Sequence, residues 1–167
     1  MAKFLKIGSS GITEEATVST SAGAGDSGKL ANLDSNGKLD ISFMPTGVGG
    51  DTQTLTAGET LSAGNLVYVN GSGAVLKADA SAASKEAVGF VLAGITNAAS
   101  GTVYFGSGVI TGLSGLTAGS AYFLSDATPG SVTTTPPSGS GKIVQRVGRA
   151  ISTTVLYFEP QAPVLLV

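Results

Sequence analysis

The sequence predicts an all-β protein, a compact antiparallel β-sandwich or barrel built from a duplicated β-unit, with an extended N-terminal arm. Glycine is unusually common, because 25 of the 167 residues are glycine, about twice the usual share. Charged residues make up only 12% of the chain, about half the usual share. A chain rich in turn-forming residues and poor in long side chains favours short strands joined by tight loops.

A repeated pattern divides the chain. Residues 61–70 read Leu-Ser-Ala-Gly-Asn-Leu-Val-Tyr-Val-Asn, and residues 116–125 read Leu-Thr-Ala-Gly-Ser-Ala-Tyr-Phe-Leu-Ser. Self-similarity of this kind indicates one structural unit used twice. We therefore predict an arm or linker at 1–50, a duplicated β-domain at 51–160 and an apolar C-terminal tail at 161–167. Three further blocks recur in the same order: 73–75 with 130–132, 88–92 with 147–151, and 102–105 with 154–158.

The arm has no sustained hydrophobic period. Its Ser/Thr/Gly/Ala tract at 8–28 should by itself be mobile or extended, because it can bury too little apolar surface. An Asn-Gly pair at 36–37 marks a tight turn. Leu39, Ile41 and Phe43 alternate with polar residues, which predicts a strand with one buried face.

Five strands are predicted in the first copy, at 52–57, 65–70, 74–78, 87–95 and 101–110. The second and third form a hairpin around an Asn-Gly-Ser-Gly turn. The fourth is a nearly continuous apolar run, as expected of a strand buried on both faces. Residues 79–86 are short and lack an apolar stripe, so we expect at most one turn of helix there.

The second copy follows the same plan, with strands at 120–125, 131–135, 142–151 and 154–158. One difference between the copies stands out. Arg149 takes the place of Phe90, and Gln145 and Arg146 lie just upstream. The second copy is therefore predicted to be wetter on one side, as an edge strand or a strand between subunits would be.

The composition excludes several kinds of chemistry. The chain has no cysteine and no histidine, which removes disulfides, thiolate catalysis, the commonest metal ligand and the usual acid–base group. A net charge of −2 is unlike the basic footprint of a nucleic-acid-binding protein or a polybasic membrane anchor. No apolar run approaches the ~20 residues of a membrane helix. We expect a soluble protein that is not an enzyme, with no cofactor, no metal site, and no nucleic-acid or membrane partner.

Two segments match ligand-binding patterns only in part. Residues 23–29 fit the first part of a phosphate-binding loop, but Leu30 stands where a hydroxyl should follow the lysine. Asp34 and Asp40 flank a turn, but they lack the spacing and the closing Glu of an EF-hand. We interpret the first as a chance match and the second as a solvated turn. Repeated aromatic residues in corresponding strands favour a core or interface role over sugar stacking; they are Tyr68, Tyr104, Tyr122 and Tyr157.

Apolar residues in the arm and the tail form the candidate interaction site. They are spaced along segments that cannot form a core of their own, which suggests that a neighbouring subunit or another protein covers them. The candidates are Phe4, Leu5, Ile7, Leu30, Leu33, Leu39, Ile41, Phe43, Met44, Val164, Leu165, Leu166 and Val167.

Several blocks resemble a β-module of tailed-bacteriophage structural proteins. These blocks are 61–69, 87–91, 112–119, 122–125, 128–130, 133–137 and 144–148, and the segment 33–40 with Met44-Pro45 is similar to linker sequence of phage fibres. Such modules occur in capsid decoration (cement) proteins, head fibres and tail fibres. The resemblance implies a homotrimer on a virion, assembled in the host cytoplasm, without catalytic residues to carry over.

Two functions are compatible with this resemblance. In the first, the β-domain trimerises on the outer shell and the arm lies across the major capsid protein, so that capsomer contacts are stabilised. In the second, the chain is a tail-fibre or receptor-binding module whose arm enters a tail or baseplate and whose β-domain meets a glycan. The first is preferred because fibres usually carry long repetitive shafts, which this sequence lacks.

Overall fold

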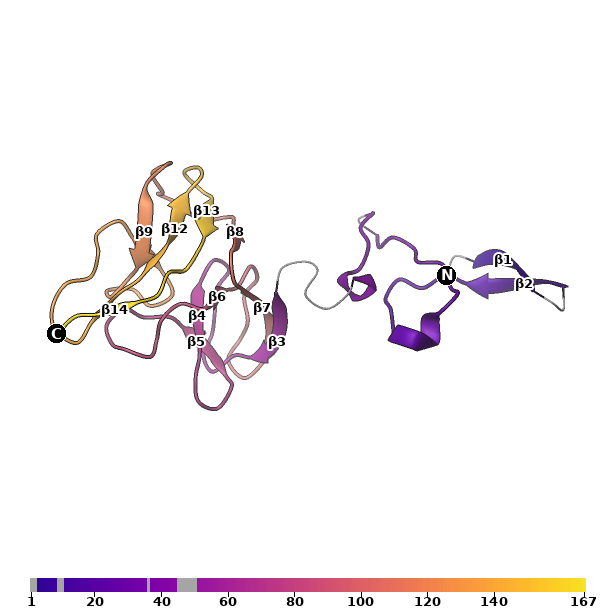
Figure 1. Ribbon diagram of the computed structural model, residues 1–167, viewed down its shortest axis with the longest axis horizontal. Coiled ribbons are helices and arrows are strands. Elements are labelled where there is room, and N and C mark those ends of the chain that lie inside the picture. Colours follow the sequence, from indigo (N-terminus) through magenta and orange to yellow (C-terminus); the bar gives the residue numbers. More distant parts are fainter. Residues whose placement is uncertain (1–2, 9–10, 36, 45–50) are drawn as a thin grey trace. The chain divides into compact units, whose positions relative to one another are not determined.

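The structure is a computed structural model and describes residues 3–8, 11–35, 37–44 and 51–167. The chain divides into two compact units, Met1–Gly49 and Gly50–Val167 (Figure 1). The N-terminal unit contains strands β1 (Lys3–Gly8) and β2 (Gly11–Ala16) and the short 3-10 helices η1 (Gly23–Asp26) and η2 (Ile41–Phe43). The second unit is called the β-unit below.

The β-unit consists of short strands joined by turns. Its strands are β3 (Thr52–Thr56), β4 (Leu66–Val69), β5 (Val75–Lys77), β6 (Gly89–Phe90), β7 (Ser100–Phe105), β8 (Gly108–Ile110), β9 (Ala121–Leu124), β10 (Val132–Thr133), β11 (Ile143–Val144), β12 (Arg146–Ala150), β13 (Leu156–Phe158) and β14 (Val164–Leu165). Every ladder between these strands is antiparallel. The predicted all-β antiparallel fold is confirmed.

Two five-stranded sheets make up most of the β-unit. The first sheet has the order β3-β7-β6-β4-β5, and the second has the order β8-β13-β12-β9-β10. The repeated pattern matches β4, β5, β6 and β7 with β9, β10, β12 and β13, and these strands follow the same order in the two sheets. The edge strands β3 and β8, which the pattern did not match, take the same place in each order. Figure 1 shows the two sheets as separate groups of strands, and neither sheet closes on itself within the described residues. A β-barrel, one of the two predicted forms, is therefore not formed by these strands.

The pairing register is also the same in the two sheets. Gly89 of β6 lies opposite Val67 and Phe105, and Gly148 of β12 lies opposite Tyr122 and Phe158. Gly89 and Gly148 are glycine for a common reason. A Cβ atom at Gly89 would collide with the carbonyl oxygen of Tyr104, and one at Gly148 with the carbonyl oxygen of Tyr157. The repeated glycine thus permits close approach of two backbones.

Two clusters of buried side chains form the interior. The shared core lies between the sheets and draws on residues from each copy: Leu66, Ala78, Ala80, Ala87, Phe90, Ile110, Leu116, Tyr122, Leu124, Ile143, Val147, Ala150, Leu156 and Phe158. The first-sheet core lies on the other face of the first sheet: Ala57, Leu61, Val67, Val75, Val91, Ile95 and Val103. Buried side chains therefore cover both faces of the first sheet. The buried side chains of the second sheet lie on one face only, the face toward the shared core.

Three predicted strands differ from the observed ones. Residues 101–110 form two strands in different sheets, because the chain turns at Gly106 with φ +69° between β7 and β8. In 87–95 the only strand is the two-residue β6, Ile95 forms a single bridge with Leu61, and Val88 and Leu92 are exposed, so the run is not one continuous strand buried on both faces. In 142–151 the chain forms β11 and then β12, which belong to different sheets.

Two predictions for the N-terminal unit were also wrong or incomplete. The strand expected at Leu39, Ile41 and Phe43 is not formed: Ile41–Phe43 is the 3-10 helix η2, and Leu39 lies outside any helix or strand. The tract 8–28 contains β2, which pairs with β1 from Lys3↔Ala16 to Gly8↔Gly11. The Asn-Gly turn is observed at its described residue, Gly37, which has φ +72°. Residues 45–50 and Asn36 lie outside the described part of the chain.

Candidate functional site

The β1–β2 hairpin presents three aliphatic side chains on one face. Strand alternation and the observed register place Leu5, Ile7 and Ile12 on the same side, with Ile7 directly opposite Ile12. These side chains are 71%, 83% and 68% exposed, respectively. Because cross-strand neighbours lie within contact distance, the three form one apolar surface, called the hairpin face below. Ile12 was not among the predicted residues, because the tract around it was interpreted only by composition.

Charged side chains border the hairpin. The Lys3 ammonium lies 2.6 Å from the Glu14 carboxylate, and the Lys6 ammonium lies 3.1 Å from the Glu15 carboxylate. Such exposed pairs contribute little to stability. They do fix a polar margin beside the hairpin face, since alternation puts Lys3 and Glu14 on the same side as Leu5.

The remaining arm candidates are spread over segments with little regular structure. Leu30, Leu33, Leu39 and Met44 are exposed, while Phe4 and Phe43 are half-buried. Ile41 belongs to η2, and its side chain is not among those that the structure describes. No residue of this unit whose exposure is described is buried. The described part of the N-terminal unit thus holds its apolar side chains at its surface and forms no core of its own.

Two of the C-terminal candidates, Val164 and Leu165, form strand β14, and Leu166 and Val167 follow it. Strand β14 pairs with β11 through Val164↔Val144 and Leu165↔Ile143. The Leu166 N–H donates to the Lys142 carbonyl at 2.8 Å. The side chains of Val164 and Leu165 nevertheless stay 62% and 51% exposed, Leu166 is half-buried and Val167 is fully exposed. The backbone of this segment is therefore satisfied while its apolar side chains face outward.

In the segment that matches a phosphate-binding loop, residues 23–29, the Asp26 carboxylate bonds groups of the same segment and its neighbour. Asp26 accepts the Ala22 N–H at 2.6 Å and pairs with the Lys29 ammonium at 2.9 Å. The backbone bond from Ala22, followed by the bond from Lys29, lowers the pKa of the Asp26 carboxyl. The Lys29 ammonium, which would face a phosphate in such a loop, thus pairs with Asp26.

The two acids near the Asn-Gly turn serve the local backbone. Asp34 accepts the Lys38 N–H at 2.8 Å, and Asp40 accepts the Ser42 N–H at 2.9 Å. Hydrogen bonds from Ser42 lower the pKa of the Asp40 carboxyl. Within the described residues, no group of three or more acidic side chains is placed to hold a metal ion.

Gln145 joins the two copies inside the β-unit. Its side chain is 2% exposed, accepts the Ala87 N–H at 2.8 Å and donates to the Ala87 carbonyl at 2.9 Å and the Gln161 carbonyl at 3.1 Å. The prediction that Gln145 makes this side wetter was wrong. A buried amide can satisfy several backbone groups at once, and here two of them belong to Ala87 just before β6 and the third to Gln161 after β13.

The repeated tyrosines are not equivalent in their surroundings. Tyr122 is buried and its hydroxyl accepts the Thr117 N–H at 2.9 Å. Tyr104 stacks on Phe90 with ring centroids 5.4 Å apart. Tyr157, which occupies the place of Tyr104 in the second sheet, is 40% exposed. One tyrosine of this pair thus packs in the interior and its counterpart faces outward.

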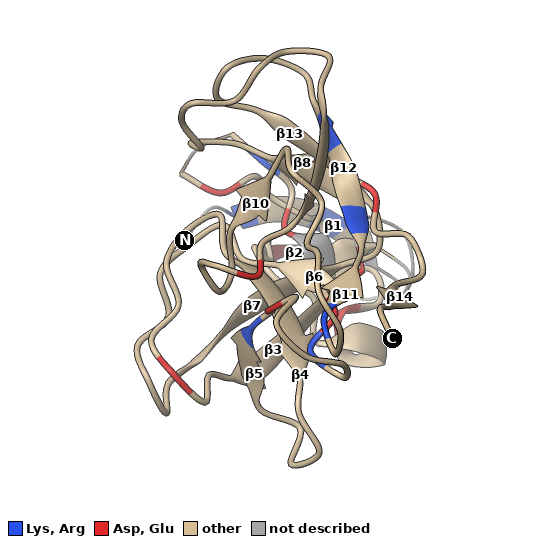
Figure 2. Ribbon diagram, turned by 90° about the vertical axis from the view of Figure 1, so that its left-hand side faces the viewer, with Lys and Arg blue, Asp and Glu red and all other residues tan. Residues whose placement is uncertain are grey.

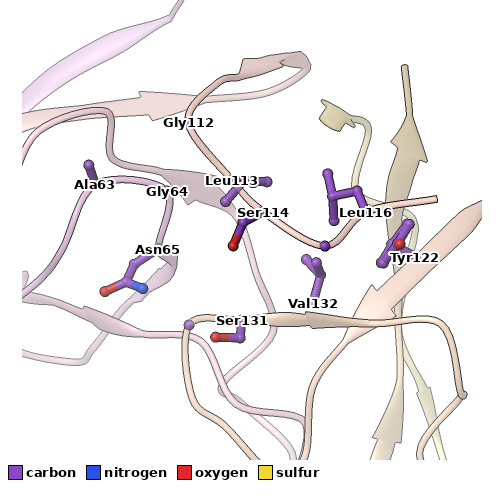
Figure 3. Close-up of a pocket in the computed structure, with 12 residues that line it drawn as sticks. Ala63, Gly64, Asn65, Gly112, Leu113, Ser114, Leu116, Tyr122, Ser131 and Val132 are labelled. Atoms are coloured by element: carbon purple, nitrogen blue, oxygen red, sulfur yellow. The ribbon is translucent and has the colours of Figure 1, made fainter. Parts of the chain in front are cut away.

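A pocket of about 400 Å³ opens where the two sheets meet. Figure 3 shows its walls: Asn65 before β4, Leu113 in the loop after β8, Tyr122 on β9 and Ser131 before β10. None of the described residues that line it carries a charge. Sequence reasoning missed this pocket because its walls come from turns far apart in the chain.

The outer face of the second sheet carries a second exposed surface. Val109, Tyr157, Arg149 and Ala121 are cross-strand neighbours in one row over β8, β13, β12 and β9, called the outer row below. Val109 and Tyr157 are 45% and 40% exposed, and Arg149 is exposed. Figure 2 shows the two basic residues of β12 as blue segments. Arg149 is therefore exposed as predicted, but the expected edge strand is wrong, because β12 is the central strand of its sheet.

No protein-family model matches the chain, and no curated protein matches its sequence. Within the described residues, no helix has the length and hydropathy needed to cross a membrane.

Proposed function

We propose that this chain is a virion structural protein of a tailed bacteriophage, a capsid decoration (cement) protein that binds the outer shell. In this proposal the β-units assemble as a homotrimer on the shell. The N-terminal unit lies on the major capsid protein and stabilises the contacts between capsomers. The proposal rests on the resemblance of the sequence to phage β-modules together with the surface of the N-terminal unit.

The hairpin face is the observation that carries the proposal. Leu5, Ile7 and Ile12 are all more than two-thirds exposed, in a unit where no residue of described exposure is buried. Burying one such aliphatic side chain at an interface stabilises a complex by about 1.5–3 kcal/mol. Three side chains on one strand pair, bordered by charges, have the anatomy of a small interface with an apolar centre and a polar rim.

The β-unit supplies the rigid body that such a protein needs. Its shared core holds 14 buried residues from the two copies. A trimer binds a shell more tightly than a single copy does, because once one copy is bound the contacts of the other two become intramolecular. A trimer would therefore convert three weak hairpin contacts into firm attachment.

The experiment compares empty shells with and without the protein. Shells built from the major capsid protein of the same phage are saturated with the full chain, and their thermal disruption is followed by light scattering. We expect the protein to raise the disruption temperature. The triple variant Leu5→Thr, Ile7→Thr, Ile12→Thr should lose most of this effect, while threonine preserves the strand preference of the hairpin.

The control is Val69→Thr, which changes a partly exposed valine of the β-unit and should bind shells as the unaltered chain does. An unchanged disruption temperature in saturated shells would overturn the proposal. Binding to purified tails or baseplates, with none to shells, would support the tail-fibre or receptor-binding alternative.

A further inference from the structure

The pocket where the two sheets meet lies beside β10, and the equivalent space beside β5 in the first copy is occupied by the chain itself. There the chain after β3 lies directly on the strand: Ala57 forms a bridge with Val75, and the Gly58 N–H donates to the Val75 carbonyl at 2.9 Å. The Glu59 carboxylate then accepts the Lys77 N–H at 2.8 Å. Val75 is consequently fully buried.

In the second copy the corresponding connection turns away from its strand. The Leu113 N–H donates to the Thr154 carbonyl at 3.1 Å, in the turn between β12 and β13. In the described chain, no backbone hydrogen bond joins 111–115 to β10. Val132, which takes the place of Val75, is only half-buried and lines the pocket. The second copy thus leaves open a space that the first copy fills.

One wall of the pocket offers polar groups. Asn65 comes from the turn before β4, Ser114 from the connection after β8 and Ser131 from the turn before β10, and Figure 3 shows their side chains around the same opening. The Asn65 Oδ1 accepts the Ser62 N–H at 2.9 Å, which fixes the amide and leaves its NH₂ group to donate elsewhere. Together, an amide and two hydroxyls can both donate and accept hydrogen bonds.

The other wall is apolar and joins the two copies. It consists of Leu113, Leu116, Val132 and the ring of Tyr122, which points to the face of the second sheet opposite the outer row. Leu113 covers Gly64 of the first copy, where an added Cβ atom would lie 2.8 Å from the Leu113 Cδ2. A ligand in this pocket therefore meets carbon on one side and hydrogen-bonding groups on the other.

We propose that this pocket binds one unit of a neutral sugar, such as the terminal residue of a glycan. A pyranose presents C–H groups on its faces and hydroxyls at its edge, and each hydroxyl both donates and accepts, as the polar wall does. The described residues of the lining carry no charge, which disfavours phosphates, carboxylates and cations, because a desolvated ion needs a charged partner. The volume of about 400 Å³ is at the small end of ligand pockets, which suits a single unit.

Sugar binding is a function separate from attachment to a shell. The pocket belongs to the β-unit and the hairpin face to the N-terminal unit, so each can be removed by substitutions that leave the other unchanged. On a shell, many copies would bind a glycan-coated surface together, and weak single contacts would add up to firm adhesion. This adhesion rests on the proposed function, whereas binding of a sugar by the isolated chain does not.

The first test is binding of the isolated full-length chain to an array of glycans. The neutral glycans on it end in glucose, galactose, mannose, fucose, rhamnose or N-acetylglucosamine, and sialylated glycans are the charged comparison. We expect retention on at least one neutral glycan, none on the sialylated ones, and displacement by the free methyl glycoside of the same sugar. Retention on no neutral glycan would overturn the proposal, and so would equal retention on sialylated glycans.

The second test fills the pocket and measures the dissociation constant of that methyl glycoside by nuclear magnetic resonance titration. Ser114→Leu removes a hydroxyl of the polar wall and adds bulk at an exposed position. The matched control is Ser107→Leu, in the exposed turn between β7 and β8, outside the lining. We expect Ser114→Leu to weaken binding about tenfold or more, the effect of one lost hydrogen bond together with the added bulk, and Ser107→Leu to leave it unchanged.

The titration of the unaltered chain gives a readout that does not depend on how a variant folds. The side-chain amide signal of Asn65 should shift as the glycoside is added, because its NH₂ group faces the ligand. Equal affinity of the Ser114→Leu and Ser107→Leu proteins would overturn the assignment of this pocket. An Asn65 amide signal that stays in place while the sugar binds would overturn it as well.

Discussion

The two five-stranded sheets have one strand order and one register, yet they have different surroundings. The first sheet has a core on each face, and its row of Phe90 and Tyr104 is covered. In the second sheet the equivalent row of Arg149 and Tyr157 lies at the surface. Phe90 and Arg149 differ in chemistry as well as in burial, whereas Gly89 and Gly148 agree because the close approach of two backbones is shared. The covered row of the first sheet contributes to folding of the β-unit, whereas the exposed row of the second sheet is accessible to other molecules.

The largest expected effect comes from truncating the ring at the centre of the shared core. Phe158→Ala should lower the free energy of unfolding by about 3–5 kcal/mol, because the side chain is fully buried and touches Phe90 across the sheets. Phe105→Ala, at the equivalent and half-buried position, should cost clearly less. Urea unfolding followed by near-ultraviolet circular dichroism measures both. Equal losses would show that the two positions are equally buried in solution.

The repeated glycines should respond alike despite their different surroundings. Gly89→Ala and Gly148→Ala each place a Cβ atom against a backbone carbonyl of the next strand, which cannot move aside easily. Each substitution should lower the free energy of unfolding by about 3 kcal/mol, the upper end of the range for overpacking. Gly148→Ala should be the worse of the two, because its φ of +155° also disfavours a side chain.

Gly71→Ala is the matched control for the glycine variants, since nothing lies within 4 Å of an added Cβ there. Thermal unfolding of the three variants ranks them directly. A Gly89→Ala protein as stable as the Gly71→Ala protein would contradict the close approach of β6 and β7.

The link between the copies gives the third prediction. Gln145→Met keeps the length of the side chain but leaves the Ala87 N–H and carbonyl without their amide partner. Each unsatisfied buried group costs about 1–3 kcal/mol, so the free energy of unfolding should fall by at least that amount. Gln53→Met, at an exposed position of β3, should have no measurable effect. Hydrogen exchange at Ala87 should also accelerate in the Gln145 variant alone.

The smallest expected effect concerns the loops that follow the equivalent strands β4 and β9. In the first copy, Asn70 accepts the Ser72 N–H and the Ala74 N–H, each at 3.0 Å. In the second, Ser125 accepts the Ala127 N–H at 3.2 Å and the Thr128 N–H at 3.0 Å. Only the second loop adds an ion pair, in which the Lys142 ammonium lies 2.6 Å from Asp126.

The bond from Lys142 lowers the pKa of the Asp126 carboxyl below its ordinary value of 3.8. A lowered pKa stabilises the folded state above the unfolded-state value, and the benefit is lost as pH falls through the folded-state pKa. The Asp126→Asn protein should therefore have a slightly lower melting temperature than the unaltered protein at neutral pH. Far below pH 3.8 the two proteins should melt at the same temperature. A difference that persists in strong acid would show that the loss is not electrostatic.

Much of the β-unit could be predicted because its signals are local. The β4–β5 hairpin follows from an Asn-Gly-Ser-Gly turn between two apolar runs, and its register is observed as Val67↔Lys77 to Val69↔Val75. The hairpin face was only half predicted. Leu5 and Ile7 were predicted as interaction residues of the arm, but Ile12 joins them only through strand pairing.

By itself, the sequence determined the antiparallel β class and several of the turns, since these depend on residue type and short-range backbone preference. The tertiary structure decided where the chain changes sheet at Gly106, that Gln145 is buried, and that Phe90 is covered while Arg149 is not. These outcomes depend on which face of one sheet meets the other. Two copies of one pattern carry the same local information, so only packing can assign an inner face to one and an outer face to the other.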